Sequence, residues 1–273
     1  MGRARGKLAQ PPEEFVRFSL SQRAEHMAMM FSFTILVVTG LPQKFYGDPW
    51  AQTIMMTLGG IEAVRLVHRA CAVLFVLEGM YHIGYIGRLV ASGDFAPSMI
   101  PGLRDLRDAI NTFKYCIGTS SVMPKFGRFD YRQKFEYWAV VMGWLIMVGT
   151  GLIMVFPAQA TQLLPGAFIP AAKEMHGGET LLVLLIVVVW HLYGAHFNPQ
   201  RFPGDTSIFT GKISRQRMIH EHPLEYARFI RSLVEDVREE QPVPVDDVSR
   251  KDKPAELEPT FTVSGRDSFN QEY

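Results

Sequence analysis

Six of the eight histidines in this chain lie in or beside long apolar segments, where a polar ring is costly. Two of these segments carry a histidine near each end. His68 and His82 are 14 residues apart in the first, and His176 and His191 are 15 residues apart in the second. In a helix these separations correspond to about 21 and 22 Å of rise. Because neutral imidazole is a common metal ligand, the pattern predicts metal bound at two depths in a membrane.

The depth of each histidine in its segment predicts which of them can share a metal. His68 and His176 lie near the same side of the membrane, and we expect them to form one pair. His26, His82 and His191 lie near the other side and compete for two positions. Each ligand should donate its second N–H to a nearby acceptor, which fixes the tautomer of the ring.

An iron porphyrin explains this pattern better than zinc or an iron–sulfur cluster. Cys71 and Cys116 are isolated and no C-x-x-C-H motif occurs, which excludes a covalently attached haem and a cluster. Two imidazoles on opposite faces of haem b give six-coordinate iron that carries electrons with little rearrangement. We expect two haems, or three if His82 serves one of its own. Two irons about 20 Å apart would carry an electron across most of a hydrocarbon layer about 30 Å thick.

Two further polar residues could contact haem groups from the ends of these segments. Arg69 follows His68 and could pair with a haem propionate or extend to the membrane surface. His196 lies beyond His191, where it could contact a propionate, a quinone or the membrane interface.

Four apolar segments must position these residues, and their length and composition predict membrane-spanning helices. Their approximate bounds are 23–43, 62–90, 134–156 and 175–197. The mean hydropathy of the whole chain is only +0.06, because the charged residues are concentrated in the ends and loops. The sequence therefore predicts an all-α membrane protein with a four-transmembrane-helix bundle. We expect Ser19 or Ser21 to cap the first span, and Gly40 and Pro42 to end it.

We divide the chain into four parts. An N-terminal segment, 1–20, precedes a four-helix haem-binding domain, 21–200. A helical extension covers 201–240, and the composition of 241–273 predicts a flexible tail. In the loop between the second and third spans, GLRDLRDAINTFKYCIG has apolar residues at helical spacing. This stretch predicts an amphipathic helix, which either lies on the cytoplasmic membrane surface or caps the bundle.

The distribution of basic residues predicts the orientation. Lysine and arginine are frequent before the first span, between the second and third spans, and after the fourth, whereas the opposite loops carry only Lys44 and Lys173. The positive-inside rule therefore places both termini in the cytoplasm. No cleavable signal peptide is evident, so we expect the first span to direct insertion into the bacterial inner membrane.

The chain also resembles a known family. The motifs are R-F-S-x-x-x-R-x-x-H from Arg17 to His26, H-R at His68, G-R-F-D-Y-R-Q-K-F-E-Y-W from Gly127 to Trp138, and the span that holds His176 and His191. In this order they resemble the cytochrome b subunits of membrane-bound formate dehydrogenases, nickel–iron hydrogenases and thiosulfate reductases. The resemblance covers about residues 15–200.

The resemblance implies a dihaem cytochrome b that passes electrons between a hydrophilic redox partner and the quinone pool. Carried over by position, the family's ligands are His26, His68, His176 and His191, with one haem between spans two and four and the other between spans one and four. The last ligand lies 15 residues after His176, where the family has 14. His82 is additional to the family's pattern and is a rival ligand to His26.

The resemblance also implies a quinone pocket near the cytoplasmic haem. The family's G-x-F/Y-N-x-x-Q/E-K stretch corresponds here to Gly127, Phe129, Asp130, Gln133 and Lys134. Asp130 stands where asparagine is usual. Asp130, Lys134 and Glu136, with His196 nearby, are candidates for proton exchange with the quinone, since a general acid or base must reach its oxygen.

The predicted function is electron transfer by a subunit of a quinone-linked oxidoreductase. Its partners would be an iron–sulfur or multihaem cytochrome c subunit, the quinone substrate and membrane lipids, and we expect no nucleic acid. One alternative is a haem-containing membrane anchor for soluble redox subunits without a quinone site of its own. Another is a haem-free transporter whose histidines relay protons.

Overall fold

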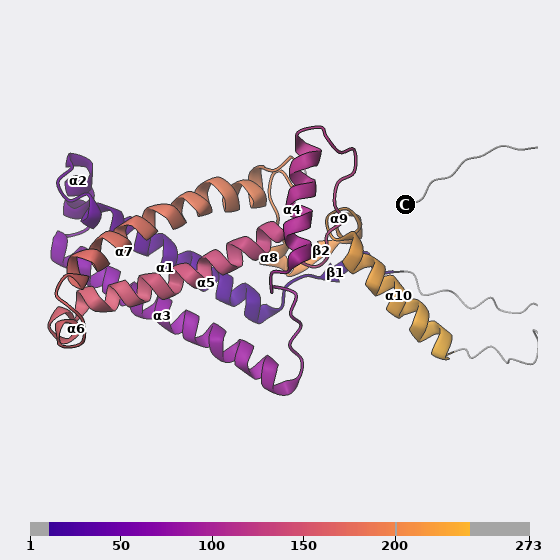
Figure 1. Cartoon of the computed structure of the whole chain (residues 1–273), viewed down its shortest axis with the longest axis horizontal. Coiled ribbons are helices and arrows are strands. Elements are labelled where there is room, and N and C mark those ends of the chain that lie inside the picture. The colour runs from indigo at the N-terminus through magenta and orange to yellow at the C-terminus, as the bar shows by residue number, and fades with distance from the viewer. Residues whose placement is uncertain (1–10, 200, 241–273) are drawn as a thin grey trace, which may run out of the picture. The chain divides into compact units, whose positions relative to one another are not determined.

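The computed structural model describes residues 11–199 and 201–240. Within these ranges, four helices are long and apolar enough to cross a membrane: α1 (Leu20–Lys44), α3 (Ile61–Ser92), α5 (Tyr131–Val155) and the helix over Phe168–Phe197. They confirm the all-α fold and the four predicted spans. All four belong to one compact unit, Gln10–Ile230, and Figure 1 shows them extending between the same two ends of that unit. The predicted tail over 241–273 lies outside the described residues.

Helix α1 begins where the sequence predicts and ends later. The Ser19 hydroxyl accepts a hydrogen bond from the backbone N–H of Gln22, and the Gln22 side chain accepts one from the N–H of Ser19. This reciprocal pair is a capping box. The sequence predicted an end near Gly40 and Pro42, and the helix continues two residues past Pro42 to Lys44. A proline in the last turn removes a single backbone hydrogen bond, which the helix tolerates there.

The fourth span changes its winding along its length. It is α-helical in α7 (Phe168–Leu185) and π-helical in η1 (Ile186–His191) and η2 (Tyr193–Phe197). A π-helical turn holds more residues than an α-helical turn.

The spans pack as two helix pairs. Helix α1 packs mainly against α3, and α5 packs mainly against α7, while α1 also contacts α7. Helix α5 approaches α3 at Gly79, where a Cβ atom would lie 2.2 Å from the Trp144 ring. The Trp144 indole donates a 3.0 Å hydrogen bond to the Phe75 carbonyl at the same place. Glycine at position 79 thus allows the two pairs to meet.

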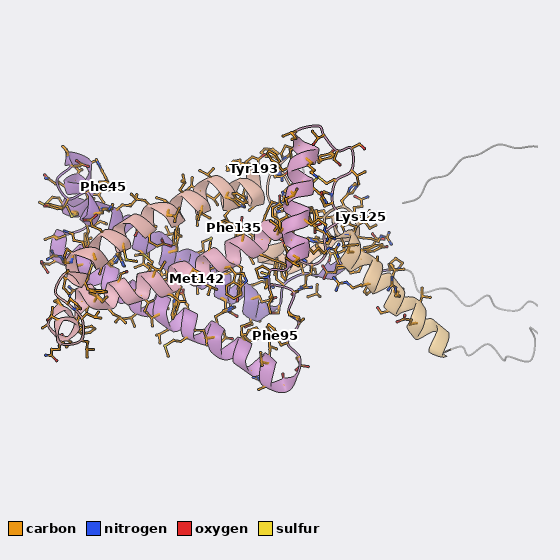
Figure 2. The ribbon with its side chains drawn as sticks, in the orientation of Figure 1. Phe45, Phe95, Lys125, Phe135, Met142 and Tyr193 are labelled. Atoms are coloured by element: carbon orange, nitrogen blue, oxygen red, sulfur yellow. The ribbon has the colours of Figure 1, made fainter. Side chains whose placement is uncertain are left out.

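Large apolar side chains cover the outside of the bundle. Phe135, Met142 and Tyr193 are each about half exposed, and Figure 2 shows them along the long helices. Buried positions within the spans include small polar residues, among them Ser32 and Thr39. This inside-out distribution suits a protein whose solvent is lipid.

Shorter elements join the spans. Helices α2 (Pro49–Thr57) and α6 (Pro157–Leu163) lie in connections for which the sequence predicted no helix, and α4 (Leu103–Cys116) confirms the predicted amphipathic helix. After the fourth span follow α8 (Ser207–Thr210), α9 (Arg215–Glu221) and α10 (Pro223–Glu240). The last described residues, from Arg231 on, continue α10 as a helix and belong to a second unit.

A small cap joins the segment before α1 to the segment after the fourth span. Strands β1 (Glu14–Val16) and β2 (Lys212–Ser214) pair antiparallel, and Phe15 and Ile213 form its apolar core with Met218. Arg17 is almost fully buried beside Glu225. Burial lowers the pKa of Arg17 to about 10, although the Glu225 carboxylate opposes this shift.

Candidate functional site

His68 of α3 and His176 of α7 face each other near one end of the bundle. Their ring centroids lie 6.4 Å apart and their planes differ by 66°. His68 Nδ1 lies 2.9 Å from the hydroxyl of Thr39, and His176 Nδ1 lies 3.0 Å from the hydroxyl of Thr150. The structure therefore brings together the two histidines that the sequence placed at this level, each with a threonine from the neighbouring helix.

The two threonines fix the tautomers of these rings. Thr39 donates its hydroxyl proton to the carbonyl of Ile35 at 2.6 Å, so its oxygen can only accept from His68. Thr150 donates to its own helix in the same way, at 2.6 Å. Each Nδ1 must then carry the ring proton, and each Nε2 keeps a lone pair. An imidazole held in this way is ready to bind a metal.

His26 and His191 face each other near the other end of the bundle. Their ring centroids lie 6.1 Å apart, with planes 37° apart. His191 Nδ1 lies 3.1 Å from a carboxylate oxygen of Glu136, which acts as its hydrogen-bond acceptor. His26 Nδ1 is buried and has no hydrogen-bond partner among the described residues. A buried nitrogen of this kind is rare unless a further group completes its surroundings.

His82 is not part of this second pair. Its Nδ1 lies 2.8 Å from Glu25 and its Nε2 lies 2.9 Å from the hydroxyl of Tyr137. Both ring nitrogens are thus engaged, and the ring that faces His191 is His26. Of the two rivals left open by the sequence, the structure favours His26 as the partner of His191.

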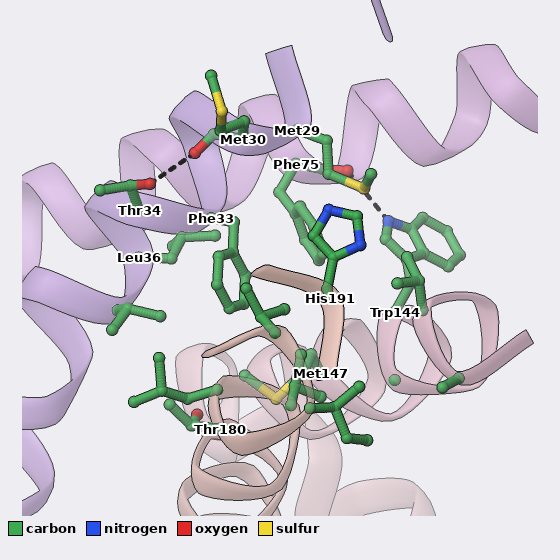
Figure 3. Close-up of a pocket in the computed structure, with 18 of the residues that line it drawn as sticks. Met29, Met30, Phe33, Thr34, Leu36, Phe75, Trp144, Met147, Thr180 and His191 are labelled. Carbon is green, nitrogen blue, oxygen red and sulfur yellow. Dashed lines mark hydrogen bonds between the residues drawn. The ribbon is translucent and has the colours of Figure 1, made fainter. Parts of the chain in front are cut away.

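Both histidine pairs line one continuous cavity. It measures about 2710 Å³ and is lined by all four spans. Typical small-molecule sites measure roughly 300–1,000 Å³, so this cavity can hold more than one large ligand. Figure 3 shows His191 in it, close to the aromatic side chains of Phe33, Phe75 and Trp144. An apolar cavity with a histidine pair near each end suits flat apolar cofactors that bind metal.

Comparison with known proteins agrees with this geometry. The family model described as prokaryotic cytochrome b561 matches residues 17–208. The chain belongs to this family. It is similar to the cytochrome b556(Fdn) subunit of the nitrate-inducible formate dehydrogenase of Escherichia coli K12 and of Shigella flexneri. Each relative is 21% identical over 211 residues, which cover 77% of this chain and 89% of the relative.

Membership of the cytochrome b561 family implies haem b, and the histidine pairs fit it. With metal–nitrogen bonds of about 2.0–2.1 Å and ring nitrogens roughly 1.1 Å from the ring centre, two imidazoles on one metal have centroids about 6.3 Å apart. The observed distances are 6.4 and 6.1 Å. Among the described residues no group of three or more His, Cys, Asp or Glu side chains gathers. Paired histidines suit an iron whose remaining four ligands belong to a porphyrin.

A glycine makes room for the ring of His68 in the cytochrome. A Cβ atom at Gly40 would lie 3.1 Å from His68 Cε1, which is a tight contact, whereas one at Gly151 would lie an ordinary 3.5 Å from His176 Cε1. Each glycine directly follows the threonine that binds the same ring, Thr39 or Thr150. The pair Thr39-Gly40 therefore both orients the imidazole of His68 and leaves space for it.

Three residues of the predicted quinone pocket have other contacts. Asp130 is the N-cap of α5: one carboxylate oxygen accepts from the backbone N–H groups of Arg132 and Gln133, and the other pairs with the Arg132 guanidinium at 2.6 Å. Gln133 accepts from the N–H of Asp130 at 3.1 Å. Lys134 pairs with Asp105 of α4 at 2.9 Å and is not among the cavity-lining residues. These contacts give all three residues structural roles, and Asp130 and Gln133 also line the cavity. Their predicted role toward a quinone stays a prediction.

The two remaining predicted residues line the cavity near its ends. Arg69 is exposed beside His68, where it can reach an anionic group. His196 lies in η2, with its ring 6.5 Å from that of Phe197. Neither residue belongs to a histidine pair.

Thr39, Thr150 and the acceptor role of Glu136 were missed by the sequence reasoning, although an internal repeat could have revealed them. RFSLSQRAEH, from Arg17, resembles RFDYRQKFEY, from Arg128, at an offset of 111 residues. The same offset relates Thr39-Gly40-Leu41 to Thr150-Gly151-Leu152. Residues that contact the histidines thus recur in the two copies.

Proposed function

We propose that this chain is a dihaem cytochrome b subunit that transfers electrons across the membrane between a hydrophilic redox subunit and quinone. The observation that supports it best is the presence of two histidine pairs near opposite ends of one apolar cavity. His68 and His176 would hold one haem, and His26 and His191 the other.

Bound haem supplies a reversible one-electron centre at each level of the bundle. The protein holds the ligands in position. Thr39 and Thr150 accept the Nδ1 protons of one pair, and Glu136 accepts that of His191. A carboxylate acceptor makes an imidazole more electron-donating than a neutral hydroxyl does. The two sites should therefore differ in redox potential.

Basic side chains line the cavity near His68 and His176, where they can neutralise carboxylates of a cofactor. They are Lys44, Arg65, Arg69 and Lys173. Near the other pair, the cavity-lining Arg132 and Arg201 are already paired with Asp130 and Glu221. Charge pairing of this kind is favourable where water is scarce. We assign Arg69 to this role, as the sequence suggested.

The partners follow by extension from the relatives, which are named as subunits of a formate dehydrogenase. We infer that this chain assembles with an iron–sulfur or multihaem cytochrome c subunit. From the basic loops we infer that both termini lie on the cytoplasmic side of the inner membrane. Haems held by the two histidine pairs would then supply the electron path between the partner and the quinone pool.

Anaerobic reduction of the purified protein by quinol tests this function. In nanodiscs, a short-chain quinol should reduce the bound haem, and a quinone-analogue inhibitor should prevent the reduction. Haem that dithionite reduces but quinol does not would contradict the proposal. It would instead support the anchor that has no quinone site of its own.

A further inference from the structure

The two helix pairs of the bundle are copies of one unit. In the first copy, Thr39 of α1 binds His68 of α3, and Glu25 binds His82 at 2.8 Å. In the second copy, α5 and α7 make the matching contacts: Thr150 binds His176, and Glu136 binds His191 at 3.1 Å. Both copies begin with a capping box, formed by Ser19 and Gln22 and by Asp130 and Gln133.

Reciprocal contacts join the two copies at their N-terminal ends. The Arg17 guanidinium donates to the carbonyl of Arg128 at 2.6 Å, and the Arg128 guanidinium donates to the carbonyl of Arg17 at 2.7 Å. The two arginines also share one carboxylate, that of Glu225, with one oxygen each. An exchange of contacts between equivalent residues is the signature of approximate twofold symmetry.

This symmetry gives His82 a defined counterpart. His68 and His176 are equivalent to each other, so their pair maps onto itself. His191 faces His26, and the residue equivalent to His191 in the first copy is His82. If the two copies are exchanged, His82 must therefore face the residue that is equivalent to His26. That residue is Tyr137, and its ring centroid lies 5.8 Å from that of His82. The chain thus contains a second version of the His26–His191 site, in which a phenol replaces one imidazole.

Hydrogen bonding determines what this second version can bind. The Glu25 carboxylate accepts the Nδ1 proton of His82, which leaves Nε2 as a hydrogen-bond acceptor. The Tyr137 hydroxyl then donates to that nitrogen over 2.9 Å. Glu25, His82 and Tyr137 all line the large cavity, so a ligand in the cavity can reach them.

We propose that His82 Nε2 binds a hydroxyl group of quinol, in the place that the Tyr137 hydroxyl occupies in this structure. A quinol is itself a phenol, so its hydroxyl offers the imidazole the same donor as tyrosine does. The cavity is apolar enough to hold the quinol ring, and Glu25 holds the imidazole in the accepting tautomer. This inference rests on the proposed function and names the residue that would bind its substrate.

Binding of quinol to three variants tests the assignment. The dissociation constant for menadiol would be measured by titration calorimetry under argon, with the haem-loaded full-length chain in nanodiscs. His82→Leu removes the acceptor and should weaken binding about fivefold, the effect of one hydrogen bond. Tyr137→Phe removes the competing hydroxyl and should strengthen binding. Tyr81→Phe is the matched control, because its hydroxyl contacts Ser21 at 3.0 Å, and it should leave binding unchanged.

The outcomes separate this inference from the proposed function. Unchanged binding in His82→Leu would overturn the assignment, and so would equal weakening by Tyr137→Phe, since that result would show a purely structural bond. His82→Gln retains an acceptor and should restore part of the affinity, and failure to do so would also count against the assignment. If quinol reduces the wild-type haem and the variants behave otherwise than expected, only the His82 assignment fails. If quinol does not reduce the wild-type haem, the proposed function fails first.

Discussion

Replacement of Thr39 by valine tests how the protein tunes the haem that we assign to His68 and His176. Valine keeps the shape of threonine and removes the hydroxyl that accepts the Nδ1 proton of His68 at 2.9 Å. That hydrogen bond makes the imidazole a stronger donor, which favours ferric iron. Its loss should therefore raise the midpoint potential of this haem.

The size of the shift follows from the strength of one hydrogen bond. A neutral hydrogen bond contributes about 1 kcal/mol, and a one-electron potential changes by about 59 mV for each tenfold change in equilibrium constant. The expected rise is therefore at most about 40 mV. An anaerobic redox titration of the visible haem absorption would measure it. Because Thr150 contacts His176 at 3.0 Å, Thr150→Val should raise the same potential by a similar amount.

Two controls make this prediction decisive. Thr39→Ser keeps the hydroxyl and should leave the potential near that of the wild type. Thr34 lies on the same helix, and its hydroxyl donates a hydrogen bond to the carbonyl of Met30. Thr34→Val removes this hydroxyl and should leave the potential unchanged. A shift of the same size in Thr39→Ser, or none in either valine variant at positions 39 and 150, would refute the reasoning.

Three further predictions concern the ligands, the space around them and the cap. His26→Ala should lose one haem per chain by the pyridine haemochrome assay, whereas His82→Ala should retain both; the opposite result would make His82 the ligand. Gly40→Val should reduce haem content because a Cβ atom there would lie 3.1 Å from His68 Cε1, while Gly84→Val, with open space around it, should not. His222 donates to the carbonyl of Gly127 at 2.7 Å, and burial, with nearby Arg17, lowers its pKa. The folded chain then binds this proton less readily than the unfolded chain, so its stability should fall as the pH drops below about 6.5. Thermal unfolding should show this loss, and His222→Gln should reduce it.

Sequence patterns predict the features of this protein that depend on the length of an apolar segment and on the rise per residue of a helix. The four spans follow from apolar segments long enough to cross a membrane, and the two histidine levels follow from helical rise. The choice between His26 and His82 as the partner of His191 depends on how each helix is rotated about its axis. These helices are apolar on all sides, so their composition does not specify that rotation. The structure provides that rotation.

Local polar roles were harder to predict. Asp130 follows a loop and precedes an apolar helix, and this context is shared by helix caps and by residues that reach into a site. In the structure its carboxylate caps α5. To predict the π-helical turns that lead to His191, one would need to know how the helices pack, and a single sequence does not give that information. Thr39 and Thr150 look like ordinary small residues until the two copies of the repeat are aligned.

The haem stoichiometry of the purified wild-type protein tests the central claim most directly. We predict two haems b per chain by the pyridine haemochrome assay, because two pairs of imidazoles face each other at distances that fit one iron each. A folded preparation that binds no haem would contradict the account. So would a wild-type chain that holds a single haem and keeps it when His176 is replaced.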